Sequence, residues 1–252
     1  MKAKVRSWKR RLERPFVLGH RGARRRAPEN TMRAFELALD EGADGVELDV
    51  RLDRDGDVVV CHDATLARVT EGRDTRAVQD LGRRELAEVD LGGGERVPRL
   101  AEVFSWAKRR GARVNVELKK DVPNRAALVL AVFRMAVLEP RAAEWMIFSS
   151  FDPQIVAALA RVVPWVASGW LVESGTGVPG RSLRERLVGA SALHPQASLV
   201  TRESIAPWQR AELPVNVWTV NDPDEARRLA ALGVDTIISD VPGAILKALG
   251  KS

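Results

Sequence analysis

The sequence has a single cysteine, Cys61, among its 252 residues, so no disulfide framework can form within the chain. No apolar run approaches the ~20 residues that a membrane-spanning helix requires. The apolar run nearest the N-terminus is Phe16-Val17-Leu18, which is too short for the hydrophobic region of a secretory signal. These absences predict a cytoplasmic protein. Its content of 45% hydrophobic and 29% charged residues is typical of a globular domain.

Positive charge is concentrated at one end of the chain. The net charge is +6, but eleven lysines and arginines and only one glutamate lie between Met1 and Arg26, so the rest of the chain is mildly acidic. An acidic body without an extended basic groove argues against a nucleic-acid partner. Residues 1–14 are therefore a basic N-terminal arm, in which Trp8 belongs to an apolar repeat of helical spacing. Weak contact with an anionic membrane surface is one interpretation of this arm. A solvated basic helix that packs Trp8 on the body is the favoured one.

The stretch from Gly45 to Asp63 organises the chain. Its first half alternates apolar and charged residues, as a strand does, and a turn signal at 53–56 precedes a second β-rich run. The pattern predicts an antiparallel hairpin with a four-residue turn. Three residue pairs face each other in the predicted register: Leu52 and Asp57, Asp49 and Val60, Glu47 and His62.

Two acidic residues inside this strand need compensation if they are buried. A divalent cation bound by Glu47 and Asp49 is the simplest explanation. The alternative, which the sequence leaves open, is that Arg21 and Lys119 balance the carboxylates without any metal.

From Val97 to the end of the chain, strand and helix patterns alternate, which is typical of a parallel sheet with helical crossovers. With no domain linker and about eight such units, we expect a closed (β/α)8 TIM barrel, of the α/β class, over residues 15–252. The second arm of the hairpin is then an extra strand, because four residues cannot make a parallel crossover. Residues 64–96 are polar and rich in turn formers; they form a small insertion, with a short helix near Arg83–Glu88, that is expected to cover the site.

The element boundaries follow from the same patterns. The expected helices include Leu100–Arg110, Arg125–Leu138, Gln154–Val162, Ser182–Ala192, Ser204–Glu212, Asp224–Leu232 and Ala244–Leu249. The expected strands include Arg113–Lys119, Met146–Ser150, Val166–Val172, a strand near Leu199, Val215–Val220 and Thr236–Ser239.

Barrel enzymes collect their active-site residues at the carboxyl ends of the strands. The residues expected at these ends are His20, Arg21, Glu47, Asp49, His62, Glu117 and Lys119, followed on later strands by Ser149, Ser150, Glu173, Trp218, Thr219, Ser239 and Asp240. The carboxylates of Glu47, Asp49 and Glu117 offer hard oxygen ligands suited to Mg²⁺ or Ca²⁺. Arg21 and Lys119 supply fixed positive charge for a phosphate. Two histidines suit acid–base catalysis near neutral pH. Together these groups predict metal-assisted cleavage of a phosphate ester.

Several residues have structural interpretations as well. Trp218 is explained equally well by packing inside the barrel. His194 lies in a weaker context and is expected to be structural. Cys61 alternates with His62, so its thiol should face the apolar side and be inert.

The ordered motifs resemble those of the glycerophosphodiester phosphodiesterases over nearly the whole chain from Phe16. The matching segments are His20-Arg21-Gly22, Pro28-Glu29-Asn30-Thr31, Glu47-Leu48-Asp49-Val50, Val60-Cys61-His62-Asp63, Val116-Glu117-Leu118-Lys119, Val217-Trp218-Thr219-Val220-Asn221, Gly233-Val234-Asp235 and Ile238-Ser239-Asp240-Val241-Pro242.

The resemblance implies a PLC-like phosphodiesterase type of TIM barrel that hydrolyses glycerophosphodiesters to glycerol 3-phosphate and an alcohol with one divalent cation, Mg²⁺ or Ca²⁺. It assigns His20 and His62 as general base and general acid. It assigns the cation to Glu47, Asp49 and Glu117, phosphate contacts to Arg21 and Lys119, and the glycerol side of the pocket to Trp218. A glycerol hydroxyl would attack phosphorus, and water would then open the cyclic phosphate.

One segment departs from the family pattern. Where the family usually has Leu-x-Arg-Thr-Thr after His62-Asp63, this chain has Leu66-Ala67-Arg68-Val69-Thr70. In this family the insertion that follows tends to shape selectivity for the alcohol. The identity of the leaving alcohol therefore stays open. A lysophospholipase D-type enzyme acting on a lipid-tailed diester is the first alternative, favoured by the basic arm with Trp8. A catalytically inactive binding barrel is the second, disfavoured because the carboxylates and both histidines are present.

Overall fold

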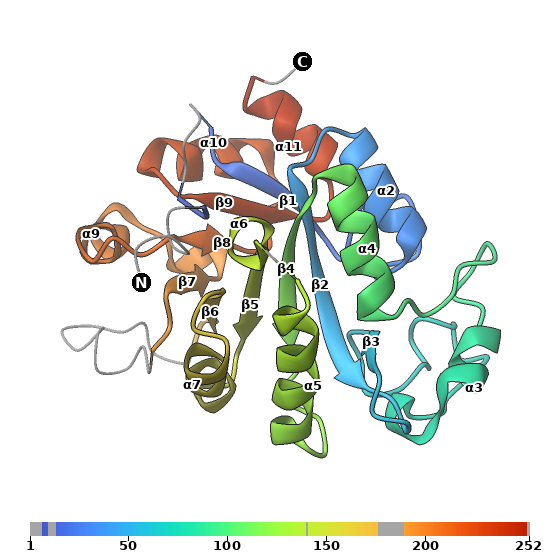
Figure 1. Cartoon of the computed structure of the whole chain (residues 1–252). Coiled ribbons are helices and arrows are strands. Elements are labelled where there is room, and N and C mark those ends of the chain that lie inside the picture. The colour runs from blue at the N-terminus through green and yellow to red at the C-terminus, as the bar shows by residue number, and fades with distance from the viewer. Residues whose placement is uncertain (1–6, 10–13, 140, 176–188, 251–252) are drawn as a thin grey trace.

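The computed structural model describes residues 7–9, 14–139, 141–175 and 189–250 (Figure 1). In this part of the chain, eight parallel strands run side by side in the order β7-β6-β5-β4-β2-β1-β9-β8. Isolated bridges from Leu193 to Val215 and from Gln196 to Trp218 join the two end strands, β7 and β8, and bring the sheet to a nearly closed barrel. Helices surround the strands, so the predicted (β/α)8 barrel is confirmed.

The strands are β1 (Phe16–His20), β2 (Gly45–Leu52), β3 (Val58–Val60), β4 (Arg113–Leu118), β5 (Met146–Ser150), β6 (Ala167–Val172), β7 (Ala192–Pro195), β8 (Asn216–Val217) and β9 (Thr236–Ser239). The helices are α2 (Met32–Asp40), α3 (Arg83–Glu88), α4 (Leu100–Arg110), α5 (Arg125–Val137), α6 (Ala142–Trp145), α7 (Pro153–Val162), α9 (Arg202–Arg210), α10 (Pro223–Leu232) and α11 (Pro242–Ala248). No helix in the described ranges combines the length and the apolar content needed to cross a membrane.

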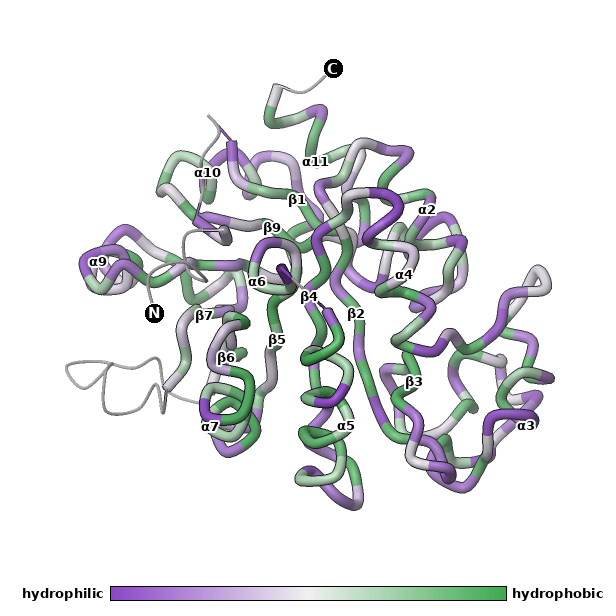
Figure 2. The backbone as a smooth tube through the Cα atoms, in the orientation of Figure 1, coloured by the Kyte–Doolittle hydropathy of each residue, from purple (hydrophilic) through white to green (hydrophobic). Residues whose placement is uncertain are grey.

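Strand β2 separates an apolar face from an acidic one. Val46, Leu48 and Val50 are buried in the layer between the sheet and the outer helices, where α2 contributes Phe35. Because side chains alternate along a strand, the acidic residues between them point into the barrel. Figure 2 shows hydrophobic stretches along the central strands and along helices α5 and α7.

The hairpin exists, but its predicted register is wrong by one residue. β3 pairs antiparallel with β2 through Val50–Val60, Arg51–Val59 and Leu52–Val58, and it is the extra strand. The cause lies at Asp53, whose Oδ1 accepts from the backbone N–H groups of Asp55 and Asp57. This cap holds a turn one residue longer than predicted, so Leu52 faces Val58 instead of Asp57.

The position predicted for the seventh strand is wrong. The expected helix over Ser182–Ala192 lies mostly outside the described residues, and its last residue begins strand β7. The strand expected near Leu199 is instead a 3₁₀ turn over Ala197–Leu199. The β7 sequence Ala-Leu-His-Pro is short and carries an imidazole, so it lacks an apolar strand pattern. The barrel accepts His194 because its Nε2 lies 2.9 Å from Asn216 Nδ2 on β8.

Trp8 closes the amino-terminal end of the barrel. Its ring is fully buried among interior residues from several strands, including Leu18 and Ile147, and its Nε1 donates to the carbonyl of Met146 at 3.2 Å. Residues 7–9 form a turn, and the rest of the predicted basic helix lies outside the described residues. Because Trp8 is buried, its indole does not provide the membrane contact considered for the arm.

Candidate active site

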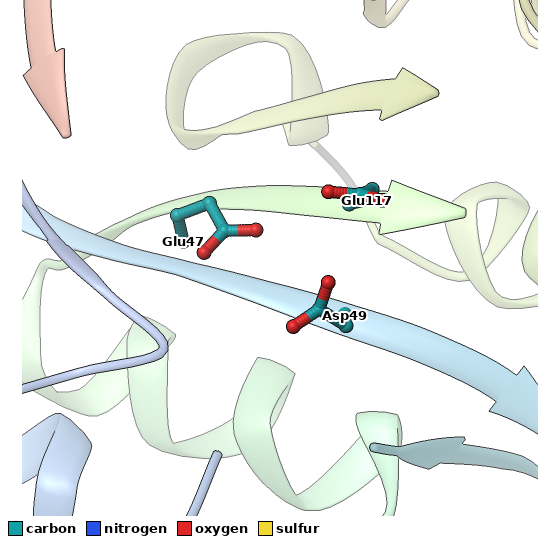
Figure 3. Close-up of side chains that lie close together, drawn as sticks. All are labelled: Glu47, Asp49 and Glu117. Atoms are coloured by element: carbon teal, nitrogen blue, oxygen red, sulfur yellow. The ribbon is translucent and has the colours of Figure 1, made fainter. Parts of the chain in front are cut away.

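The three predicted metal-ligand carboxylates converge at the carboxyl end of the barrel. Glu47 and Asp49 project from β2 and Glu117 from the adjacent β4, where Asp49 and Glu117 are register neighbours. One carboxylate oxygen from each lies within 4.8 Å of the others, and all three residues are buried. Figure 3 shows the carboxylates turned toward one another. Oxygen ligands at this spacing suit a hard divalent cation.

The positively charged side chains of Lys119 and Arg21 contact these carboxylates. Lys119 Nζ lies 2.9 Å from Glu117 Oε1 and 3.3 Å from Asp49 Oδ1. Arg21 Nε lies 3.2 Å from Asp49 Oδ2, and the backbone N–H of Arg21 donates to Glu47 at 3.1 Å. Asn30 Nδ2 donates to Asp49 Oδ2 at 2.9 Å. The side chains of Arg21 and Lys119 thus contact Asp49, as the alternative left open by the sequence requires, whereas Arg21 reaches Glu47 through its backbone N–H.

Bridging does not balance all three negative charges. Burial opposes ionisation of Asp49, but Lys119 and Arg21 hold its pKa below the usual range. Burial and the neighbouring negative charge of Asp49 raise the pKa of Glu117 to about 7. Burial, followed by Asp49 and Glu117, raises the pKa of Glu47 well above its ordinary value. The positive charges of Arg21 and Lys119 thus leave an excess of negative charge on the three carboxylates. A divalent metal cation would neutralise this excess, so the residues fit such an ion.

His20 stands at the end of β1 with one ring nitrogen anchored. Its Nδ1 lies 2.7 Å from Asp240 Oδ1, and Asn221 Nδ2 donates to the other oxygen of Asp240 at 2.8 Å. Burial opposes ionisation of Asp240, but its hydrogen bond to His20 lowers its pKa to about 2. An ionised acceptor at Nδ1 keeps that nitrogen protonated. Nε2, which lies 3.9 Å from Glu47, is then free to take a proton.

His62 follows the extra strand β3 and is held in the same way. Its Nδ1 lies 2.6 Å from Asp63 Oδ1, and Arg68 Nε donates to Asp63 Oδ2 at 2.6 Å. Burial lowers the pKa of His62, Asp49 opposes this effect, and Lys119 and Arg21 add to it. The imidazole therefore gives up a proton more readily than an exposed histidine.

Glu29 joins the insertion to the barrel at this rim. It pairs with Arg21 Nη1 at 2.9 Å, with Arg24 Nη2 at 2.9 Å and with Arg68 Nη2 at 2.7 Å. Burial opposes its ionisation, but the hydrogen bond from Arg68 and the charges of Arg21 and Arg24 lower its pKa to about 2. Through Arg68, the insertion thus fixes both Glu29 and the aspartate behind His62.

A cavity of about 410 Å³ opens between these groups. All the residues to which the resemblance assigns a role line it except Asp49, which lies just beneath with 1% exposure. Trp218 forms part of the wall, and its Nε1 donates to the carbonyl of His194 at 2.7 Å. Its ring packs edge to face against Phe151, with 5.3 Å between the ring centroids. Trp218 therefore both packs in the barrel and faces the cavity.

Several residues that position the site had no role predicted from the sequence, although their motifs were visible: Glu29, Asn30, Asp63 and Asn221. Asp240 was expected at a strand end, but not as the partner of His20. Two other expectations are confirmed. His194 is fully buried, which lowers its pKa to about 3 and makes it a neutral structural residue. Burial raises the pKa of the Cys61 thiol to about 12, which makes it a poor nucleophile.

Solved structures share this architecture. A phosphodiesterase of Oleispira antarctica in complex with the product sn-glycerol-3-phosphate is 28% identical with a TM-score of 0.84, and the match covers 94% of this chain and 97% of the other. A glycerophosphodiester phosphodiesterase of Agrobacterium tumefaciens is 29% identical with a TM-score of 0.76, covering 92% and 99%. Fold and site together define an enzyme of the barrel phosphodiesterase class.

The family follows from the sequence itself. The model of the Glycerophosphoryl diester phosphodiesterase family matches residues 20–244, and the chain belongs to this family. The chain is also 32% identical over 244 residues to a glycerophosphodiester phosphodiesterase of Caldanaerobacter subterraneus subsp. tengcongensis; the match covers 94% of this chain and 98% of its relative.

Proposed function

We propose that the protein hydrolyses glycerophosphodiesters to glycerol 3-phosphate and an alcohol, with His20 and His62 as the acid–base pair. The observation that carries the proposal is the meeting of two carboxylate-anchored histidines, two cations and three buried carboxylates around one cavity. Acid–base groups, phosphate-binding charges and a hard-cation site are together what cleavage of a phosphodiester needs.

Glu47, Asp49 and Glu117 would hold one divalent cation, Mg²⁺ or Ca²⁺, since three carboxylates offer only hard oxygen ligands. When bound, the cation would neutralise negative charge on the phosphate and on the pentacoordinate transition state.

The side chains divide the rest of the reaction. Arg21 and Lys119 bind the phosphate and hold it beside His20. His20 Nε2 removes the proton from a glycerol hydroxyl, whose oxygen attacks phosphorus. His62 gives a proton to the alcohol oxygen as its bond to phosphorus breaks. A cyclic glycerol phosphate results, with His20 protonated and His62 neutral.

The second step returns both histidines to their starting states. His62 removes a proton from the attacking water, and His20 gives its proton to the glycerol oxygen that leaves phosphorus. Glycerol 3-phosphate is released. The bound proton count is restored, so neither step needs another reactant.

The lysophospholipase D alternative drew its support from the basic arm with Trp8, and the burial of Trp8 at the opposite end of the barrel removes the indole from that support. The inactive binding barrel has no specific observation in its favour. A cytoplasmic location, the absence of a nucleic-acid partner and a membrane role for the basic arm stay predictions.

The deciding experiment measures release of glycerol 3-phosphate from glycerophosphocholine and glycerophosphoethanolamine. We expect release that EDTA abolishes and that Mg²⁺ or Ca²⁺ restores. Cleavage of a lysophospholipid alone under the same conditions would favour the lipid enzyme. Absence of any cleavage would return the inactive barrel to consideration.

A further inference from the structure

The floor of the active-site cavity holds a polar side chain that has no task in the proposed mechanism. Asn115 lies on β4 two residues before Glu117, so it points into the barrel on the same side. Its register neighbours are Glu47 on β2 and Ile147 on β5. The residue is only 1% exposed, yet it lines the cavity.

The amide of Asn115 is held in one orientation and is incompletely satisfied. Ser149 Oγ on β5 donates to Asn115 Oδ1 at 2.9 Å, which fixes the side chain. Among the residues that the structure describes, none accepts a hydrogen bond from Asn115 Nδ2. A buried amide donor without a partner is costly, so a ligand that brings an acceptor to this position gains binding energy.

Several apolar side chains line the cavity beside this amide. Trp218 and Ile238 line it and pack on the interior cluster that contains Ile147, the register neighbour of Asn115. Leu171 lines the same cavity from β6. Most of the charged lining residues belong to β1, β2 and β4 or follow these strands directly, whereas His62 follows β3 and Glu173 follows β6. A phosphate held by Arg21 and Lys119 would therefore leave a short carbon chain beside these apolar side chains, with the Asn115 amide at the floor of the cavity.

We propose that the Asn115 amide binds the glycerol hydroxyl that does not attack phosphorus, and that this contact selects glycerol esters. The inference rests on the proposed function. In that reaction one glycerol hydroxyl attacks phosphorus, and the other is chemically idle. A site with a buried hydrogen-bonding group aimed at a hydroxyl discriminates strongly against a substrate that lacks it, whereas an apolar pocket alone does not.

The test compares two substrates with the same leaving alcohol. Glycerophosphocholine has both hydroxyls, and the phosphocholine ester of propane-1,2-diol keeps the attacking hydroxyl but lacks the terminal one. We expect the wild-type enzyme to prefer the glycerol ester in kcat/KM by about tenfold or more. Asn115→Ala should lower kcat/KM for the glycerol ester and leave the diol ester nearly unchanged, so that the ratio approaches one.

Two further variants separate recognition from packing. Ser149→Ala removes the anchor of the amide and should reduce the ratio part of the way. Ser168→Ala removes another buried hydroxyl, on β6, which does not line the cavity, and should leave the ratio at its wild-type value. Should Asn115→Ala fail to fold, Asn115→Val carries the same comparison, because it removes the donor with less loss of volume.

Each result bears on a different claim. A wild-type enzyme that cleaves both esters equally well overturns the inference, as does a full preference that survives in Asn115→Ala. Failure of the wild-type enzyme to cleave either ester refutes the proposed function, and this inference with it.

Discussion

Each histidine at the cavity is fixed through Nδ1 by an aspartate, but the second partner of the two aspartates differs. Asp240 accepts a hydrogen bond from the amide of Asn221 at 2.8 Å and lies 3.8 Å from Arg24 Nε, whereas Asp63 accepts directly from the guanidinium of Arg68 at 2.6 Å. A positive charge on the far side of Asp63 reduces the pull of this carboxylate on the proton of His62. The same local motif thus fixes the orientation of both imidazoles and leaves Nε2 of each ring available for proton exchange.

We expect Asp240→Asn to lower kcat by about 10²–10⁴-fold with little change in KM. The amide that replaces the carboxylate can present N–H to His20 Nδ1, which would favour the tautomer with its proton on Nε2 and block the base. Steady-state kinetics on glycerophosphocholine measure the effect, with His20→Ala as the benchmark for loss of the base. Asp224→Asn, at an exposed carboxylate on α10, is the control and should be neutral. An Asp240→Asn enzyme within twofold of wild type would exclude this positioning role.

His194 predicts a pH dependence of stability that is independent of catalysis. Burial lowers the pKa of His194 from 6.5 to about 3. As the pH falls, His194 is therefore protonated near pH 6.5 in the unfolded chain but only near pH 3 in the folded protein. The stability that this residue contributes is complete above pH 6.5 and is lost as the pH falls through that window. His194→Gln cannot titrate, so its urea midpoint should fall less than that of the wild type between pH 7 and pH 5. Equal losses in both proteins would contradict a neutral buried imidazole.

The charged and titratable residues that meet at the cavity could be predicted from the sequence because their types are rare and their spacing is regular. The sequence did not identify their partners. Asp240 follows β9 and reaches His20 only because the barrel brings β9 beside β1, and Asn221, which follows β8, reaches Asp240 because β8 pairs with β9. A contact between residues 220 positions apart depends on the pairing of the first strand with the last, which a local pattern does not contain.

At the scale of elements, the alternation of strand and helix patterns predicted most helix and strand boundaries. The errors lie where a polar side chain forms contacts that the apolar pattern does not reveal. The hairpin register shifted because the carboxylate of Asp53 caps two backbone N–H groups and lengthens the turn. Strand β7 was missed because His194 breaks its apolar pattern, and only the facing amide of Asn216 makes that residue acceptable inside the barrel. Both errors come from single polar side chains that find partners in the folded protein.

The N-terminal segment predicts a strong effect on stability. Trp8→Ala should lower the free energy of unfolding by about 3–5 kcal/mol, because it opens a large cavity among buried interior residues. Urea unfolding measures the loss. Trp165→Ala, the same substitution at a tryptophan that is 40% exposed, should cost much less. Since Trp8 lies at the end of the barrel away from the cavity, folded Trp8→Ala should keep its kcat. A loss no greater than that of Trp165→Ala would contradict the role of Trp8 in closing the barrel.

At the scale of the whole molecule, the two ends of the barrel have opposite character. The amino-terminal end is closed by apolar packing around Trp8, whereas the carboxyl end concentrates three buried carboxylates whose charge two cations do not balance. Parallel strands place all their carboxyl ends together, so residues distant in sequence meet at one rim. That rim is a local source of instability within an otherwise well-packed barrel, and binding of a divalent cation would relieve it.

This division predicts how a cation affects the stability of the whole protein. Adding Mg²⁺ or Ca²⁺ to EDTA-treated protein should raise Tm, since a ligand at 100 times its Kd stabilises the folded state by about 2.7 kcal/mol. For a chain of this size, that corresponds to a shift of roughly 5–10 °C. Thermal unfolding followed by circular dichroism measures it without any assay of activity.

Glu117→Gln should affect the stability of the cation-free protein and that of the cation-bound protein differently. Without a cation, the variant should be at least as stable as the wild type, because burial and the charge of Asp49 already disfavour ionisation of Glu117 and raise its pKa to about 7. With a cation, it should show little or no rise in Tm, because one ligand charge is gone. Glu173→Gln, which changes a carboxylate lining the same cavity outside the cluster, should keep the wild-type shift. If Glu117→Gln gained as much stability from the cation as the wild type, Glu117 would not be a ligand, and the excess charge at the rim would have to be balanced in another way.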